Sequence, residues 1–113
     1  MATRYYIRIP DAEQAQAAGE FGFRSRGAEG LAAELQDALR SDALFQRWRA
    51  TQDDPDAVDP SMGATDPDAT VLGEPDDLHA DLIVTTTLPG GLFKHRLRLL
   101  AGNTWQLRDV SAA

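Results

Sequence analysis

The sequence predicts a single α+β domain over residues 1–113: one or two N-terminal strands, a broken helix, and a three-stranded antiparallel meander packed against that helix. Three patterns predict it. Residues Arg4–Pro10 alternate, Ala28–Leu39 has apolar residues at helical spacing, and Leu78–Val110 alternates again across two glycine turns. A chain of 113 residues, 42 % hydrophobic and 26 % charged, has the length and composition of one globular domain.

The first strand is predicted where aromatic and β-branched residues alternate with a period of two. Tyr5, Ile7 and Ile9 fall on one face, and Tyr6 and Arg8 fall on the other. The proline that follows either ends the strand or marks a sheet edge, because proline cannot donate a ladder hydrogen bond. We expect this strand to join the sheet at an edge.

The segment after this strand carries weaker signals. Asp11–Gly19 is rich in Ala, Gln and Glu, which is compatible with a short helical turn or with a loop. Phe21 and Phe23 stand two residues apart around a glycine, which predicts a short second strand with a bulge.

The clearest helix is predicted over Ala28–Leu39, with Ser25 as its N-cap. Its apolar residues recur at helical spacing, and together they form one stripe: Ala28, Leu31, Ala32, Leu35, Ala38 and Leu39. The pattern breaks near Ser41, and a shorter helix is predicted over Ala43–Ala50. The residues expected to be buried in this second helix are Leu44, Phe45 and Trp48.

Residues 51–77 are predicted to form a Pro- and Asp-rich acidic loop, because four prolines and two glycines disfavour regular structure. Unstructured loops of this length are usually mobile or functional. The carboxylates that are candidates for a divalent cation are Asp54, Asp56, Asp59, Asp66 and Asp68. Their spacing does not match a calcium-binding loop, so the simpler interpretation is a solvated loop, and neither a metal nor a cofactor is predicted.

The meander is predicted as three strands, Leu78–Leu88, Phe93–Leu100 and Thr104–Val110. A three-residue loop at 101–103 separates apolar from cationic faces, whereas a two-residue turn mixes them. In the preferred register the predicted helix packs on an apolar face made of Leu97, Leu99, Trp105 and Leu107. The opposite face carries four cations, Lys94, Arg96, Arg98 and Arg108.

These four cations are the predicted binding residues. Such a face can receive an anion, a phosphate or an acidic partner. The alternative is a solvated sheet face, which is common for long cationic side chains on an exposed antiparallel sheet.

The same register places His95 opposite Asp109. A carboxylate beside an imidazole can fix its tautomer and raise its pKa, as in catalytic dyads. The alternative is that Asp109 only satisfies the histidine, since no nucleophile is predicted nearby.

The distribution of charge limits the function. The chain carries a net charge of −7 at pH 7, which argues against binding to nucleic acid or to an anionic membrane. Residues 50–93 hold ten acids and no Lys or Arg, whereas residues 94–113 hold four bases and one acid. The chain has no cysteine, which excludes disulfides and thiolate chemistry. It also has no apolar run long enough for a signal core or a membrane span, so we expect a cytoplasmic protein.

Two hypotheses for the function follow from these patterns. The first is a non-catalytic interaction or regulatory module that uses its basic sheet face and acidic loop to bind an unknown protein partner or a second copy of itself. The alternative is a small ligand-binding domain or enzyme, with His95 and Asp109 in a pocket between helix and sheet.

Overall fold

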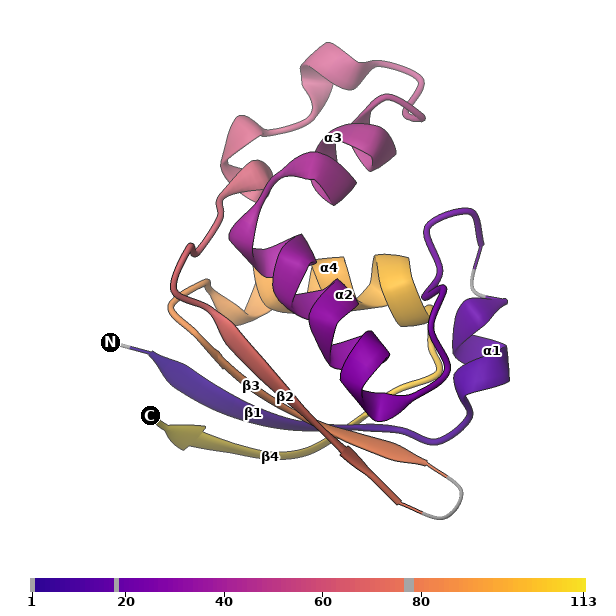
Figure 1. Ribbon diagram of the computed structural model, residues 1–113. Helices are drawn as coiled ribbons and strands as arrows, with labels where there is room; N and C mark the ends of the chain where they lie inside the picture. The colour runs from indigo at the N-terminus through magenta and orange to yellow at the C-terminus, as the bar shows by residue number, and fades with distance from the viewer. Residues whose placement is uncertain (1, 18, 77–78) are drawn as a thin grey trace.

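The computed structural model describes residues 2–17, 19–76 and 79–113, and its centre is an antiparallel sheet of four strands in the order β2-β3-β1-β4 (Figure 1). The strands are β1 (Thr3–Ile9), β2 (Thr70–Pro75), β3 (Ala80–Thr86) and β4 (Gln106–Ala112). The helices all lie on one face of this sheet, and the other face is bare (Figure 1). The predicted α+β class is confirmed.

Four α-helices and two short 3₁₀ helices complete the described chain. They are α1 (Ala12–Gln16), α2 (Ala28–Arg40), α3 (Ala43–Arg49), η1 (Pro55–Ala57), η2 (Pro60–Gly63) and α4 (Gly90–Ala101). Helix α2 follows β1 and precedes β2, and α4 joins β3 to β4, so two split βαβ units interleave in one sheet. The two longest helices, α2 and α4, pack side by side on the sheet.

Strand β1 is confirmed, but its expected place at an edge is wrong. It lies between β3 and β4 and forms antiparallel ladders with both. Tyr5, Ile7 and Ile9 are buried under the helices, and the ring of Tyr5 stacks on Phe93 of α4 with 4.4 Å between centroids. Pro10 does not interfere, because it comes after the last paired residue of the strand.

Helix α2 is confirmed, and all six residues of its predicted apolar stripe are buried. Its N-cap is Gly27 rather than Ser25. The Ser25 amide instead donates to a carboxylate oxygen of Glu34, at 2.9 Å, so the preceding loop is tied to the side of the helix. The break near Ser41 and the short helix after it are also confirmed, although Trp48 is only partly buried.

The main correction concerns α4, which replaces the predicted strand Phe93–Leu100. The segment has apolar residues both at alternate positions and at helical spacing. The helical period was hard to recognise because a charged residue, Arg96, occupies one position of the buried helical stripe. None of residues 90–101 is β-branched, and their Lys, Arg and Leu residues favour helix. The three-stranded meander and its predicted register are therefore wrong, and β4 pairs with β1 instead.

Two smaller corrections follow. The predicted strand at Phe21–Phe23 is not formed; Phe23 is buried, and its amide donates to the carbonyl of Leu100 at 2.8 Å. The acidic segment, predicted to lack regular structure, contains η1, η2 and the edge strand β2. Helix α2 packs mainly on β2 and also contacts α4 and β3, and the predicted sheet face of Leu97, Leu99, Trp105 and Leu107 is not formed because Leu97 and Leu99 belong to α4.

Candidate functional site

The bare face of the sheet is the first candidate site, because its side chains form ordered rows across the strands. Leu72 of β2 is opposite Ile83 of β3, and Ile83 is opposite Tyr6 of β1. Leu72 is 63 % exposed, and Ile83 and Tyr6 are half-buried. An apolar row therefore crosses three neighbouring strands with no helix above it (Figure 1).

Polar rows lie on both sides of this apolar row. On one side Glu74 is opposite Asp81, and Asp81 is opposite Arg8. The Arg8 Nε atom donates to Asp81 Oδ1 at 3.1 Å, so this row is held by an ion pair. On the other side the register aligns three residues: Thr70, Thr85 and Arg4.

A shallow depression of about 220 Å³ lies over the charged row and over two members of the apolar row, Tyr6 and Ile83. The residues that line it are Tyr6, Ile7, Arg8, Glu74, Asp81, Leu82, Ile83 and Arg108. An apolar centre with a charged rim is the composition of many protein-binding surfaces.

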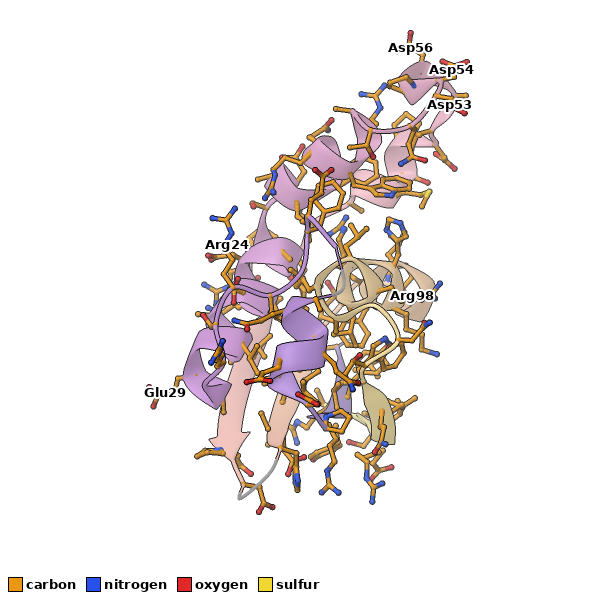
Figure 2. All side chains as sticks on the ribbon, turned by 90° about the vertical axis from the view of Figure 1, so that its right-hand side faces the viewer. Arg24, Glu29, Asp53, Asp54, Asp56 and Arg98 are labelled. Atoms are coloured by element: carbon orange, nitrogen blue, oxygen red, sulfur yellow. The ribbon has the colours of Figure 1, made fainter. Side chains whose placement is uncertain are left out.

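The four predicted binding cations do not share one surface. Arg108 lines the depression on the bare face, whereas Lys94 and Arg98 belong to α4 on the opposite, helical side of the sheet (Figure 2). Arg96 is fully buried. The predicted basic sheet face is therefore not formed, because three of its four members belong to a helix.

Arg96 has an internal role. Its guanidinium donates to the carbonyl oxygens of Ala38, Met62 and Ala64 at 3.0, 2.7 and 2.7 Å. It also lies over the ring of Phe45, 5.8 Å from the centroid. Burial lowers the pKa of Arg96, and the carboxylate of Asp42 acts in the opposite direction.

The cross-strand pairing of His95 with Asp109 is not formed either. His95 lies on α4, where its ring meets the ring of Trp48 edge to face with centroids 4.5 Å apart. Asp109 lies on β4 opposite Tyr6, and its carboxylate accepts from the Val110 amide. Burial lowers the pKa of His95, and the nearby charges of Arg96 and Arg98 lower it further. A catalytic role for the two residues stays a sequence-based prediction.

The acidic candidates for a cation separate into two kinds. Asp54 and Asp56 lie at the far end of the arm built by α3 and η1, together with Asp53 (Figure 2). Asp56 is bridged to Arg49 at 3.6 Å. Asp59 caps η2, where hydrogen bonds from Ser61 lower the pKa of its carboxyl.

Asp66 is buried and serves the interior of the fold. It accepts from the Thr86 hydroxyl at 2.9 Å, and from the amides of Thr87 and Asp68 at 2.8 and 3.1 Å. Burial tends to raise the pKa of Asp66, but these hydrogen bonds outweigh it, and the pKa lies below the ordinary value. The hydrogen bond from the Asp68 amide to the Asp66 carboxylate links these two residues, and among the described residues they do not form a cluster with the other acidic candidates.

A second cluster lies at the β2–β3 hairpin, and the sequence analysis missed it. Among the described residues, Asp76, His79 and Asp81 are a group whose potential ligand atoms all lie within 4.8 Å of one another. The spacing Asp-x-x-His-x-Asp at a strand turn was the available signal, since residues 79 and 81 share one face of an extended strand.

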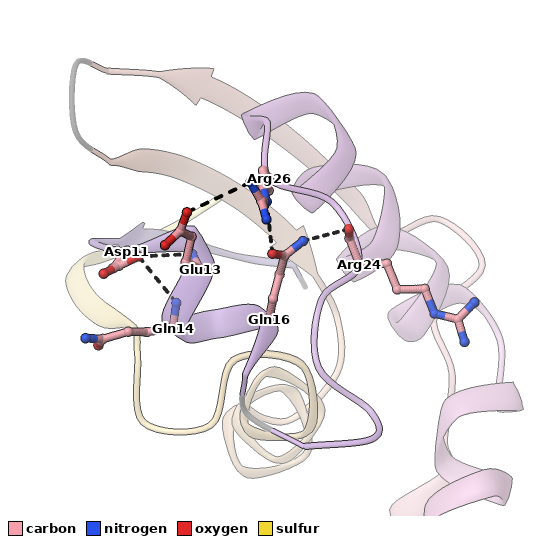
Figure 3. Close-up of polar contacts among 6 residues, drawn as sticks. All are labelled: Asp11, Glu13, Gln14, Gln16, Arg24 and Arg26. Atoms are coloured by element: carbon pink, nitrogen blue, oxygen red, sulfur yellow. Dashed lines mark hydrogen bonds and ion pairs between the residues drawn. The ribbon is translucent and has the colours of Figure 1, made fainter.

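A cavity of about 350 Å³ adjoins this hairpin cluster on the side of α1 and α2. Its lining includes Asp76, His79, Arg26 and Gly27. Arg26 forms part of the cavity wall and is held in place by Gln16. The Arg26 Nε atom donates to the Gln16 side-chain oxygen at 3.2 Å, and the Gln16 side-chain nitrogen donates to the Arg24 carbonyl at 2.7 Å (Figure 3).

Comparison of this chain with protein-family models, with curated proteins and with solved structures gives no match. Within the described ranges, none of the helices has the length and apolar character needed to cross a membrane.

Proposed function

We propose that this protein is an interaction module whose bare sheet face packs against the same face of a second copy. The observation that carries the proposal is the row formed by Leu72, Ile83 and Tyr6, which crosses three strands without a covering helix. Exposed apolar side chains rimmed by polar ones are typical of protein–protein interfaces.

The charges favour a protein over a nucleic acid at this face. The face carries Glu74 and Asp81 beside its arginines, and the chain has a net charge of −7. A phosphate backbone needs a surface of net positive charge, because its affinity comes mainly from neutralised phosphates. The exposed acidic tip of the arm adds to this repulsion.

A second copy is the favoured occupant because the charged row is self-complementary. We consider a two-fold axis that runs parallel to the strands, midway between β1 and β3. It stacks β1 of each copy over β3 of the other, so Arg8 faces Asp81 and Tyr6 faces Ile83. Each contact occurs twice, as in any isologous interface, so the Arg8–Asp81 contacts flank the Tyr6–Ile83 contacts, and Leu72 of β2 lies over β4 of the other copy.

Light scattering coupled to size exclusion tests the proposal with one pair of matched variants. Leu72→Asp places a carboxylate in the apolar row, whereas Leu107→Asp places one on a leucine that is 40 % exposed and paired with buried Ile7, on the helical side of the sheet. We expect the mass of two 12.3-kDa chains for the wild type and for Leu107→Asp, and the mass of one chain for Leu72→Asp.

Two results would contradict the proposal. One is a wild-type protein that remains at the mass of one chain across the whole accessible concentration range. The other is a dimer that Leu107→Asp dissociates and Leu72→Asp leaves intact, which would move the interface to the exposed edge at β4.

A further inference from the structure

We propose that the β2–β3 hairpin holds a divalent transition-metal site, best suited to Zn²⁺, whose three protein ligands are Asp76, His79 and Asp81. All three ligands belong to one chain, so the site does not require the proposed dimer, although Asp81 and its partner Arg8 also belong to the charged row of the bare face.

The hairpin backbone brings the three side chains together. His79 and Asp81 are two residues apart, which directs both side chains to one side of an extended chain. Asp76 is placed across from them because its amide donates to the His79 carbonyl at 3.0 Å. The ladder between Pro75 and Ala80 continues directly from this hydrogen bond. Asp81 thus lies within β3, and Asp76 and His79 directly flank the ends of the paired strands.

The spacing of the ligand atoms matches tetrahedral coordination. His79 Nε2 lies 3.2 Å from Asp76 Oδ2 and 3.6 Å from Asp81 Oδ2. With Zn–N and Zn–O bonds of about 2.0–2.1 Å, two ligands of a tetrahedral ion are separated by about 3.3 Å. Both distances from the imidazole nitrogen are close to this value, and the ligand atoms of Asp76 and Asp81 lie within 4.8 Å of each other.

The imidazole supplies an independent observation. His79 Nε2 is shielded from solvent and makes no hydrogen bond, although carboxylate oxygens of Asp76 and Asp81 lie 3.2 and 3.6 Å away. A buried polar nitrogen without a hydrogen bond normally costs free energy. Coordination of a metal by a neutral imidazole nitrogen uses this atom directly.

The surrounding residues support the ligands as an outer shell. Arg8 Nε binds Oδ1 of Asp81, at 3.1 Å, which leaves Oδ2 directed to His79. Metal-binding carboxylates are commonly oriented by such a hydrogen bond. The second nearby arginine, Arg26, is engaged by Gln16 and lies 3.9 Å from Glu13, so its charge is directed to other partners (Figure 3).

The cavity of about 350 Å³ beside Asp76 and His79 supplies access and a fourth position. Three protein ligands with one position left to water are the pattern of an open zinc site. One imidazole with two carboxylates favours Zn²⁺ and its neighbours over Mg²⁺ or Ca²⁺, which prefer sites made only of oxygen ligands.

The experiment titrates the full-length protein with ZnCl₂ and follows the imidazole nitrogens by NMR. The chain has two histidines, so His95 is an internal control on the same spectrum. We expect Zn²⁺ to shift the His79 Nε2 resonance at stoichiometric concentration and to leave His95 unchanged. Co²⁺ is expected to give the visible absorption of a tetrahedral site.

Variants assign the ligands. His79→Ala and Asp81→Asn are expected to abolish the stoichiometric response, and His95→Ala to retain it. Arg8→Gln is expected to weaken binding by about 10- to 100-fold, the usual effect of removing an outer-shell partner.

The proposal is wrong if Zn²⁺ in molar excess leaves the His79 resonances in place, or shifts His79 and His95 to the same extent. This wild-type measurement does not depend on whether the variants fold. MgCl₂ and CaCl₂ serve as comparison titrations, and a response equal to that of Zn²⁺ would likewise overturn the assignment.

Discussion

Arg96 in α4 donates a hydrogen bond of 3.0 Å to the carbonyl oxygen of Ala38, in the last turns of α2. The last carbonyls of a helix have no partner within the helix, so this bond satisfies one of them in the interior. The same guanidinium binds the carbonyls of Met62 and Ala64, which fastens the acidic segment to both helices.

Replacement of Arg96 by Met is therefore expected to destabilise the fold strongly. It removes three hydrogen bonds from a charged donor and leaves buried carbonyls without partners, which should lower the free energy of unfolding by about 3 kcal/mol or more. Urea denaturation measures this. Arg98→Met, on the exposed side of the same helix, is the control and should change stability by less than about 0.5 kcal/mol.

Asp66 should make the fold sensitive to acid. Its carboxyl has a pKa below the ordinary value of 3.8, so the ionised form stabilises the folded state above that pH, and this contribution is lost as the pH falls through the folded pKa. Asp66→Asn is expected to cost about 1–3 kcal/mol at pH 7 and less at pH 3. Asp68→Asn, at an exposed position, is the matched control, and an equal loss at both pH values for Asp66→Asn would contradict this account.

His95 should also make the fold sensitive to acid, at a higher pH than Asp66 does. Its pKa is lowered by burial against Trp48 and by Arg96 and Arg98, so between about pH 6.5 and the folded pKa the unfolded chain binds the proton and the folded chain does not. Stability should fall as the pH decreases through this window. NMR titration of His95 should give a midpoint below 6.5, and Arg98→Gln should raise it. A midpoint at or above 6.5 in the wild type would contradict the burial of the ring.

Gly73 should tolerate no side chain, because α2 packs directly on β2 at this position. A Cβ atom there would lie 2.2 Å from the Ala28 carbonyl oxygen, and a backbone atom at the start of α2 cannot move without shifting the helix. Gly73→Ala is expected to cost about 1–3 kcal/mol, as overpacked sites usually do. Gly91→Ala in α4 has nothing within 4 Å of the new Cβ and should be neutral or slightly stabilising. Thermal denaturation of both variants makes the comparison.

The elements that were predictable are those in which one pattern dominates. The alternation of Tyr5, Ile7 and Ile9 specifies β1, and the stripe from Ala28 to Leu39 specifies α2, because each fits one period only. Strand β2 was missed because it is a short edge strand that ends in proline and contains Gly73, within a segment rich in turn residues.

The candidate sites were less predictable than the elements. The basic face depended on Phe93–Leu100 being a strand, and it disappears once α4 buries Arg96. The apolar row of Leu72, Ile83 and Tyr6 requires knowing which three strands are neighbours, and alternation along one strand carries no information about its partners.

By itself, the sequence determined the α+β class, the buried faces of β1 and α2, and the break between α2 and α3, because these depend on periodicity along the chain. Only the tertiary structure decided that the bare face holds an apolar row, and that Arg96 belongs to the interior. It alone also brought Asp76 and His79 together with Asp81. The first two features depend on the order of the strands and on the helical state of α4, and the third depends on the pairing of β2 with β3. Contacts between residues far apart in the chain decide the strand order and the state of α4, and periodicity along one segment does not record them.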